Sequence, residues 1–222
     1  LFAAGLAPSG NKDPFAQRRA ALGLVQNLIA WNLDFDIALG LRAAADLLPI
    51  PASVESQAAV KEFLVERLRN ALLDQGWRYD VVDAILAVQG SNPAGAARAV
   101  RQMSKWTKRP DWNDILPTYA RCVRITREFS ETFPVDKEIL VEPSEQLLEE
   151  AVQSAEAAVR APGSVDDFLD AFLPLMPVIK RFFDDVLVMA EDIRLRQNRL
   201  GLLQRVAALA SGVADMSRLE GF

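Results

Sequence analysis

The residue types that most often carry acid–base chemistry are scarce in this sequence. Histidine is absent from the 222 residues, and the one cysteine is Cys122. A Ser-His-Asp triad, a Cys-His pair, a histidine-ligated zinc and an internal disulfide are therefore excluded. Adjacent carboxylates at Asp166-Asp167, Asp184-Asp185 and Glu191-Asp192 could bind Mg²⁺ or act as general acids. Neighbouring helix positions point about 100° apart, so helix capping or a solvated surface is the favoured interpretation. Cys122 lies in a segment of helical apolar spacing and is expected to be a core residue.

The distribution of charge indicates a different chemistry, the binding of an anion. Positions 101–128 carry seven Lys or Arg and three carboxylates, an excess of +4, whereas 131–150 carry one Lys and seven carboxylates, a balance of −6. The whole chain has a net charge of −5, so attraction to nucleic acid is expected only from a local face. Trp106 and Trp112 lie in the positive stretch, where indole rings could stack on unpaired bases beside the phosphates. Alternatively, both rings anchor the core and the cations are solvated surface residues.

The predicted RNA-contacting residues are basic or aromatic positions of the positive stretch, with two arginines from the last predicted helix. They are Arg101, Lys105, Trp106, Lys108, Arg109, Arg121, Arg124, Arg196 and Arg199. Catalytic, cofactor-binding and metal-binding residues are not expected in this chain.

Apolar residues recur at three- and four-residue steps along nearly the whole sequence, and no stretch alternates as a strand does. The sequence therefore predicts an all-α fold, a helical bundle. Predicted helices cover 13–31, 80–88, 115–129, 144–160, 178–189 and 190–211. Prolines flank Ile50 and predict a domain boundary there, which divides the chain into 1–50 and 51–222.

No apolar run approaches the roughly 18 residues of a membrane span, and the first residues lack the charged start of a signal peptide. We therefore expect a cytoplasmic location. Because residue 1 is Leu rather than Met, we also expect the chain to be part of a longer protein.

Three stretches resemble the C-terminal part of the beta subunit of bacterial glycyl-tRNA synthetase. Residues 8–23 contain Asp-Pro-Phe followed by Arg-Arg, with Gln17 where the family usually has Leu. Residues 63–87 contain Glu-Arg-Leu-Arg, Asp-Gln-Gly and Asp-Val-Val-Asp-Ala, similar to a helix pair of that family. Residues 182–203 contain Phe-Phe-Asp-Asp-Val-Leu-Val-Met and Asn-Arg-Leu-Gly-Leu-Leu, which resemble two further blocks.

This resemblance implies a particular organisation. Residues 1–50 would be the end of an HD-like helical domain, and 51–222 a DALR-type domain that grips the anticodon region of tRNA(Gly). The His-Asp metal pair that names the HD fold cannot be present, because the chain has no histidine. Arg121 falls where the family has Arg, whereas Arg124 replaces the usual Asn.

The resemblance further implies that the chain is a non-catalytic part of a glycine-tRNA ligase, supporting ATP-dependent attachment of glycine to tRNA(Gly). Glycine activation, with ATP and Mg²⁺, would occur on an alpha subunit or alpha region. Two alternatives remain: a helical assembly module that docks on the alpha chain without touching RNA, and an independent helical enzyme that uses carboxylates.

Overall fold

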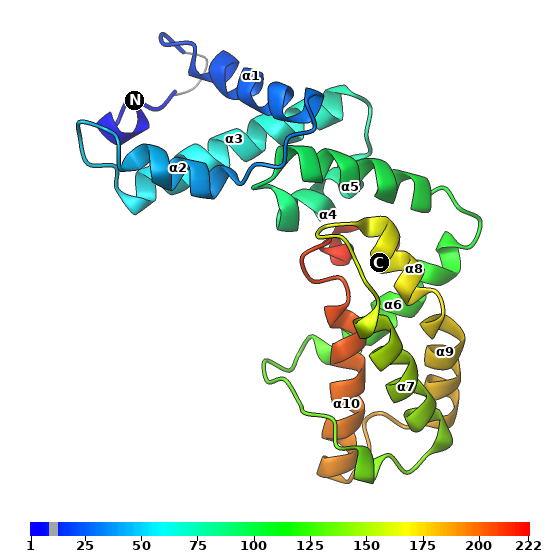
Figure 1. The fold of residues 1–222 in the computed structure, drawn as a ribbon. Coiled ribbons are helices and arrows are strands. Elements are labelled where there is room, and N and C mark those ends of the chain that lie inside the picture. The colour runs from blue at the N-terminus through cyan, green and yellow to red at the C-terminus, as the bar shows by residue number, and fades with distance from the viewer. Residues whose placement is uncertain (9–12) are drawn as a thin grey trace. The chain divides into compact units, whose positions relative to one another are not determined.

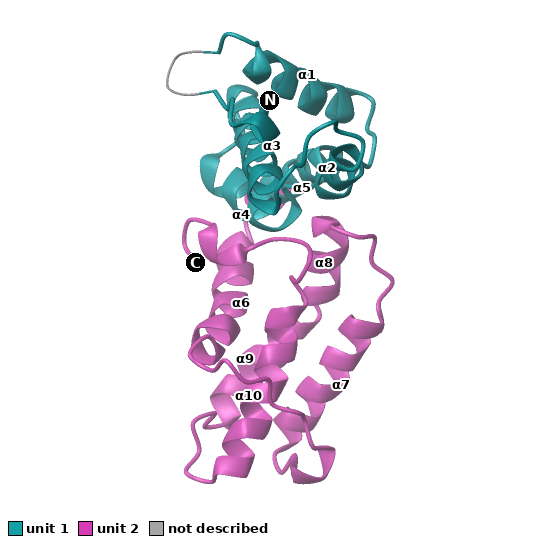
Figure 2. Ribbon diagram, turned by 90° about the vertical axis from the view of Figure 1, so that its left-hand side faces the viewer, with its two compact units in different colours: residues 1–104 teal, residues 105–222 magenta. Residues whose placement is uncertain are grey.

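A computed structural model describes residues 1–8 and 13–222 of the chain. Within this part, all regular secondary structure is helical, as ten α-helices and three short 3-10 helices (Phe2–Ala4, Lys137–Ile139 and Met216–Arg218). The predicted all-α fold is confirmed. The chain divides into two compact units, Leu1–Ser104 (unit 1) and Lys105–Phe222 (unit 2), coloured separately in Figure 2.

Unit 1 is built around one long helix that packs against three shorter ones. Its helices are α1 (Gln17–Ala30), α2 (Ile37–Ala45), α3 (Val54–Asp74), α4 (Tyr79–Gln89) and α5 (Pro93–Trp106), whose last two residues belong to unit 2. α3 lies against α1, α2 and α4 (Figure 1). Ala21, Ile37 and Leu64, one from each of α1, α2 and α3, form a buried cluster. The predicted division into 1–50 and 51–222 stays a prediction about family domains.

Charged residues of the second matched block, 63–87, join α3 to α4. The Arg69 guanidinium donates to both carboxylate oxygens of Asp83, with N–O distances of 2.6 and 2.9 Å. This bidentate pair joins the two helices, and the hydrogen bond with Asp83 raises the pKa of Arg69. A structural role is therefore sufficient to explain why Arg69 and Asp83 occur in this block.

The first helix begins later than the sequence predicts. α1 starts at Gln17 instead of Asp13, and the Asp13 carboxylate accepts hydrogen bonds from the Gln17 and Arg18 amides at 2.8 and 2.9 Å. Ala16 has a φ of 54°, so the chain turns through the left-handed region before the helix. Residues 9–12 of the first matched block lie outside the described residues.

Unit 2 contains five α-helices, and four of them pack against one another in a closed ring. Its helices are α6 (Trp112–Thr126), α7 (Pro143–Ala157), α8 (Val165–Phe172), α9 (Leu175–Asp185) and α10 (Ile193–Ala208). α10 packs against α6 and α7, and α9 packs against the same two helices (Figures 1 and 2). The buried Tyr119 ring makes edge contacts with Phe168 and Phe172, and its hydroxyl donates to the Ala207 carbonyl at 2.7 Å. One side chain thus ties α6 to α8 and α10.

α10 also holds the segment 131–136 through two side-chain amides. Asn198 accepts from the Asp136 amide at 2.6 Å and donates to its carbonyl at 3.1 Å. Gln204 accepts from the Phe133 amide at 2.9 Å and donates to the Glu131 carbonyl at 2.8 Å. Four backbone groups of an irregular segment are thereby satisfied.

Candidate nucleic-acid interface

The helix that carries most of the predicted site is α6, and its sequence sorts its residues onto two faces. Ile115, Leu116, Tyr119 and Ala120 are buried, whereas 113, 114, 117, 121 and 124 are exposed. The helix spans Trp112–Thr126 instead of the predicted 115–129, which puts a proline in the second turn. Pro117 lies on the exposed face, where water can serve the carbonyl that its missing N–H leaves free. Arg121 and Arg124, three residues apart, therefore share the outer face.

Several predicted cations are exposed and carry no neutralising carboxylate. Lys105, Lys108, Arg121 and Arg124 are exposed in unit 2, and none of them forms an ion pair with a described carboxylate. Arg127, the C-cap of α6, is exposed as well. Part of this charge suits the C-terminal end of the α6 dipole. The excess nevertheless remains available to an external anion.

Arg101 belongs to unit 1, unlike the other predicted cations. It is exposed on α5, and no ion pair joins it to a described carboxylate. Its predicted contact with RNA stays a prediction.

The two tryptophans do not present faces to solvent. Trp106 is 5% exposed and Trp112 is 7% exposed. The Trp106 indole N–H donates to Asp166 Oδ1 at 2.8 Å, and the Arg109 guanidinium covers the ring at 4.2 Å from its centroid. The predicted stacking role does not fit this placement, because both rings are core anchors, as in the alternative interpretation.

Arg109 is also engaged by its own neighbour. Its guanidinium donates to both oxygens of Asp111 at 2.9 and 2.7 Å. This hydrogen-bonded pair raises the pKa of Arg109 and lowers the pKa of Asp111. Arg109 therefore contributes little net charge to an approaching phosphate.

Some carboxylates of the acidic segment that follows pair with arginines of α10. Glu145 and Arg199 are both buried, and Arg199 Nε donates to Glu145 Oε1 at 2.5 Å. Arg199 also donates to the Leu187 carbonyl at 2.9 Å. Glu149 accepts from Arg205, which also forms a two-pronged pair with Glu156. The structure thus places Arg199 inside unit 2, while the predicted Arg196 is half-buried near the start of α10.

The paired carboxylates behave as helix-end and surface residues. Asp192 caps α10 by accepting from the Arg194 and Leu195 amides, and Asp185 pairs with Arg181. Asp167 accepts from the Ala161 amide at 2.7 Å. No group of three or more Cys, Asp or Glu in residues 1–8 and 13–222 is arranged to hold a metal ion.

Cys122 is a core residue, as predicted from its apolar surroundings. It is fully buried in α6, and burial raises the pKa of its thiol to about 12. At neutral pH the group is a protonated, inaccessible thiol rather than a nucleophile.

Two residues that line a hollow with Arg121 were not among the predicted site residues, because the sequence pattern assigned their segment mainly to the core. Lys180 and Phe183 of α9 lie beside Arg121 and line, with Asp114 and other residues, a hollow of about 240 Å³. Their three-residue spacing places them on one helix face, but nothing in the sequence pairs that face with α6.

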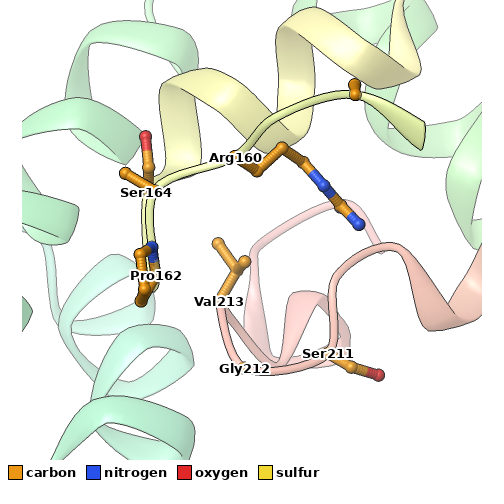
Figure 3. Close-up of a pocket in the computed structure, with 9 residues that line it drawn as sticks. Arg160, Pro162, Ser164, Ser211, Gly212 and Val213 are labelled. Carbon is orange, nitrogen blue, oxygen red and sulfur yellow. The ribbon is translucent and has the colours of Figure 1, made fainter. Parts of the chain in front are cut away.

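A second cavity, of about 350 Å³, lies between the turn that follows α7 and the turn that follows α10 (Figure 3). Its walls include Arg160, Pro162 and Ser164 on one side and Ser211, Gly212 and Val213 on the other. Arg160 Nη1 already donates to the Leu209 carbonyl at 2.8 Å. The guanidinium thus helps to join the two turns.

No helix in the described part of the chain is both long and apolar enough to cross a membrane.

Comparison with known proteins finds similarity to one family. Residues 1–87 match the family model described as glycyl-tRNA synthetase beta subunit. The chain is 34% identical over 229 residues (98% of its length) to the glycine-tRNA ligase beta subunit of Moorella thermoacetica, covering 33% of that protein. It is 35% identical over 224 residues (99% of its length) to that of Janthinobacterium sp., covering 32%.

A relative from a plant is also similar along the whole chain. The chain is 34% identical over 224 residues (100% of its length) to the chloroplastic/mitochondrial glycine-tRNA ligase 2 of Arabidopsis thaliana. It covers 21% of that protein and about a third of the bacterial ones.

Proposed function

We propose that this chain, which is related over its whole length to glycine-tRNA ligase beta subunits, holds the anticodon region of tRNA(Gly) while glycine is attached elsewhere. The observation that carries the proposal is the set of exposed, unneutralised cations Lys105, Lys108, Arg121 and Arg124 in unit 2. An exposed cation with no carboxylate partner keeps its full charge for a phosphate of an approaching polyanion.

Phosphate contacts from these residues would fix the position of the RNA without reading its sequence. None of the four side chains must leave a described carboxylate to reach a phosphate, so binding carries no cost of breaking an ion pair. By holding the far end of a long substrate, the chain would help to place the acceptor end at the active site.

Catalysis is assigned to the rest of the enzyme in this proposal. ATP, Mg²⁺ and the activation of glycine belong to an alpha subunit or alpha region, and this chain binds and orients. A cytoplasmic location is also part of the proposal, although one relative is named as a chloroplastic/mitochondrial protein.

Replacing Lys105→Ala together with Lys108→Ala tests the proposal. Affinity for tRNA(Gly) is expected to fall about tenfold at 0.1 M salt. The slope of log affinity against log salt should flatten by roughly 1.5 units, since binding releases fewer counterions from the RNA when two phosphate contacts are lost. Both quantities can be measured by filter binding or fluorescence anisotropy over a salt series.

The matched control is Arg181→Ala with Arg218→Ala, which removes the same charge from unit 2. These two arginines are exposed but paired, with Asp185 and Asp215. Affinity equal to that of the unchanged chain is expected for the control. If the lysine variant and the control behave alike, the basic segment is not the contact surface.

A second candidate function, docking on the alpha chain, is favoured by the surface of unit 1. Trp31 is 76% exposed, Leu47 is 85% exposed and Val54 is 77% exposed. Leu39, Leu48 and Ile50 are also exposed. Large exposed apolar side chains of this kind are available to a protein partner.

Leu47→Asp distinguishes this candidate. Because Leu47 is exposed, the variant should fold with nearly unchanged stability, whereas co-sedimentation with the alpha chain should weaken at least tenfold. Val159→Asp is the control, since Val159 is a fully exposed apolar residue of unit 2. Equal co-sedimentation of the two variants would remove Leu47 from the docking surface.

A further inference from the structure

The hollow between α6 and α9 combines apolar walls with two cations. Pro117 of α6 and Ile179 of α9 contribute apolar surface, and Arg121, Lys180 and Phe183 also line the hollow. Its volume of about 240 Å³ lies below the roughly 300–1,000 Å³ of most small-molecule sites. A single flat ring with one attached charged group fits such a space better than a larger ligand.

Arg121 is held in place by an aromatic ring rather than by an acid. Its guanidinium carbon lies 3.8 Å from the centroid of the half-buried Phe183 ring. This cation–π contact orients the guanidinium plane without using its N–H donors. Because no described carboxylate pairs with Arg121, the free face and edge of the guanidinium remain open to a ligand.

Lys180 supplies a second positive group at the same hollow. Its ammonium nitrogen lies 3.8 Å from Asp114 Oδ2, and both side chains are more than half exposed. An exposed pair at this distance is weak, so an arriving phosphate can take over the lysine. The hollow therefore offers two cations against one carboxylate.

We propose that this hollow is a binding site for one unpaired nucleotide of an RNA strand. The base stacks on the Arg121–Phe183 pair, and Lys180 contacts an adjacent phosphate. Stacking on aromatic rings and on guanidinium planes is the usual way in which proteins hold unstacked bases. The inference rests on the proposed function, because it names the part of unit 2 that receives a base.

The experiment uses the full chain and a tRNA(Gly) anticodon hairpin with 2-aminopurine at one unpaired loop position after another. Stacking of this fluorescent base on the protein is expected to quench its emission at one position. Arg121→Lys keeps the charge but loses the planar group. It should weaken hairpin affinity about five- to tenfold and abolish that quenching. Phe183→Leu should act in the same direction.

Arg181→Lys is the matched control, since Arg181 is an exposed arginine of α9, the helix that carries Phe183. Its hairpin affinity and quenching should equal those of the unchanged chain. Circular dichroism checks that each variant is folded, and Arg121→Lys decides the outcome if Phe183→Leu is not.

The results separate this inference from the broader proposal. If the chain binds the hairpin but Arg121→Lys changes neither affinity nor quenching, the nucleotide site is overturned and the tRNA-binding function stands. If the unchanged chain does not bind the hairpin, both fail. If free nucleoside monophosphates bind as tightly as the hairpin, the hollow is a small-molecule site and the RNA assignment is overturned.

Discussion

Replacing Arg199→Ala is expected to lower the free energy of unfolding by about 3–5 kcal/mol, because it leaves Glu145 as a buried, unpaired charge. The two side chains are 8% and 1% exposed and are joined at 2.5 Å. The same substitution also removes the donor to the Leu187 carbonyl, which holds the segment between α9 and α10. Urea unfolding followed by circular dichroism measures the loss.

The coupling between the two charges is tested by a double replacement. Glu145 Oε2 also accepts from the Glu142 amide at 2.8 Å at the start of α7, so Glu145→Gln is the change that retains an acceptor there. Arg199→Met with Glu145→Gln removes both charges and should cost less than the sum of the single changes.

An exposed pair provides the contrast for this prediction. Arg218→Ala breaks the pair with Asp215 at the surface, and its effect should stay within about 1 kcal/mol. A loss for Arg199→Ala as small as that for Arg218→Ala would contradict the structural role assigned to the buried pair. In that case Arg199 would again be a candidate for RNA contact.

Gly201→Ala is expected to destabilise the chain by about 2 kcal/mol, although alanine is the better helix former. A Cβ atom at this position would lie 2.6 Å from the Phe133 carbonyl oxygen and 3.2 Å from Val135 Cγ2. The backbone at Phe133 cannot move away freely, because Gln204 holds its amide. The clash therefore strains the whole 131–136 segment.

Gly23→Ala is the matched control, because Gly23 lies inside α1 and a Cβ there meets nothing within 4 Å. It should gain up to about 1 kcal/mol from helix propensity alone. Thermal or urea unfolding of the two variants gives opposite signs if the contact with Phe133 decides the outcome. A gain for both would mean that the 131–136 segment adapts without cost.

The last matched block is mainly structural. Asn198 and Gly201 contact the segment 131–136, and Arg199 forms a buried ion pair with Glu145. The leucines of the block, Leu200, Leu202 and Leu203, are fully buried. The sequence pattern of residues 182–203 does not distinguish residues that pack in the core from residues that contact RNA. That separation depends on where the 131–136 segment lies, which is a long-range feature.

The sequence by itself determined the all-α fold and the resemblance to the family. Helical periodicity is a local property, so the helical class followed from the spacing of the apolar residues alone. Periodicity predicts helix ends less well. The helix α6 begins three residues earlier than predicted, because the buried Trp112 extends its core face.

Only the tertiary structure decided which charges remain available. Arg199 meets Glu145 across 54 positions, and Trp106 meets Asp166 across 60. Arg121 finds its aromatic support on α9. Periodicity states which face of a helix is turned inward, but the partner on the other side is set by the packing of distant segments, and that packing alone neutralises one arginine and leaves another free.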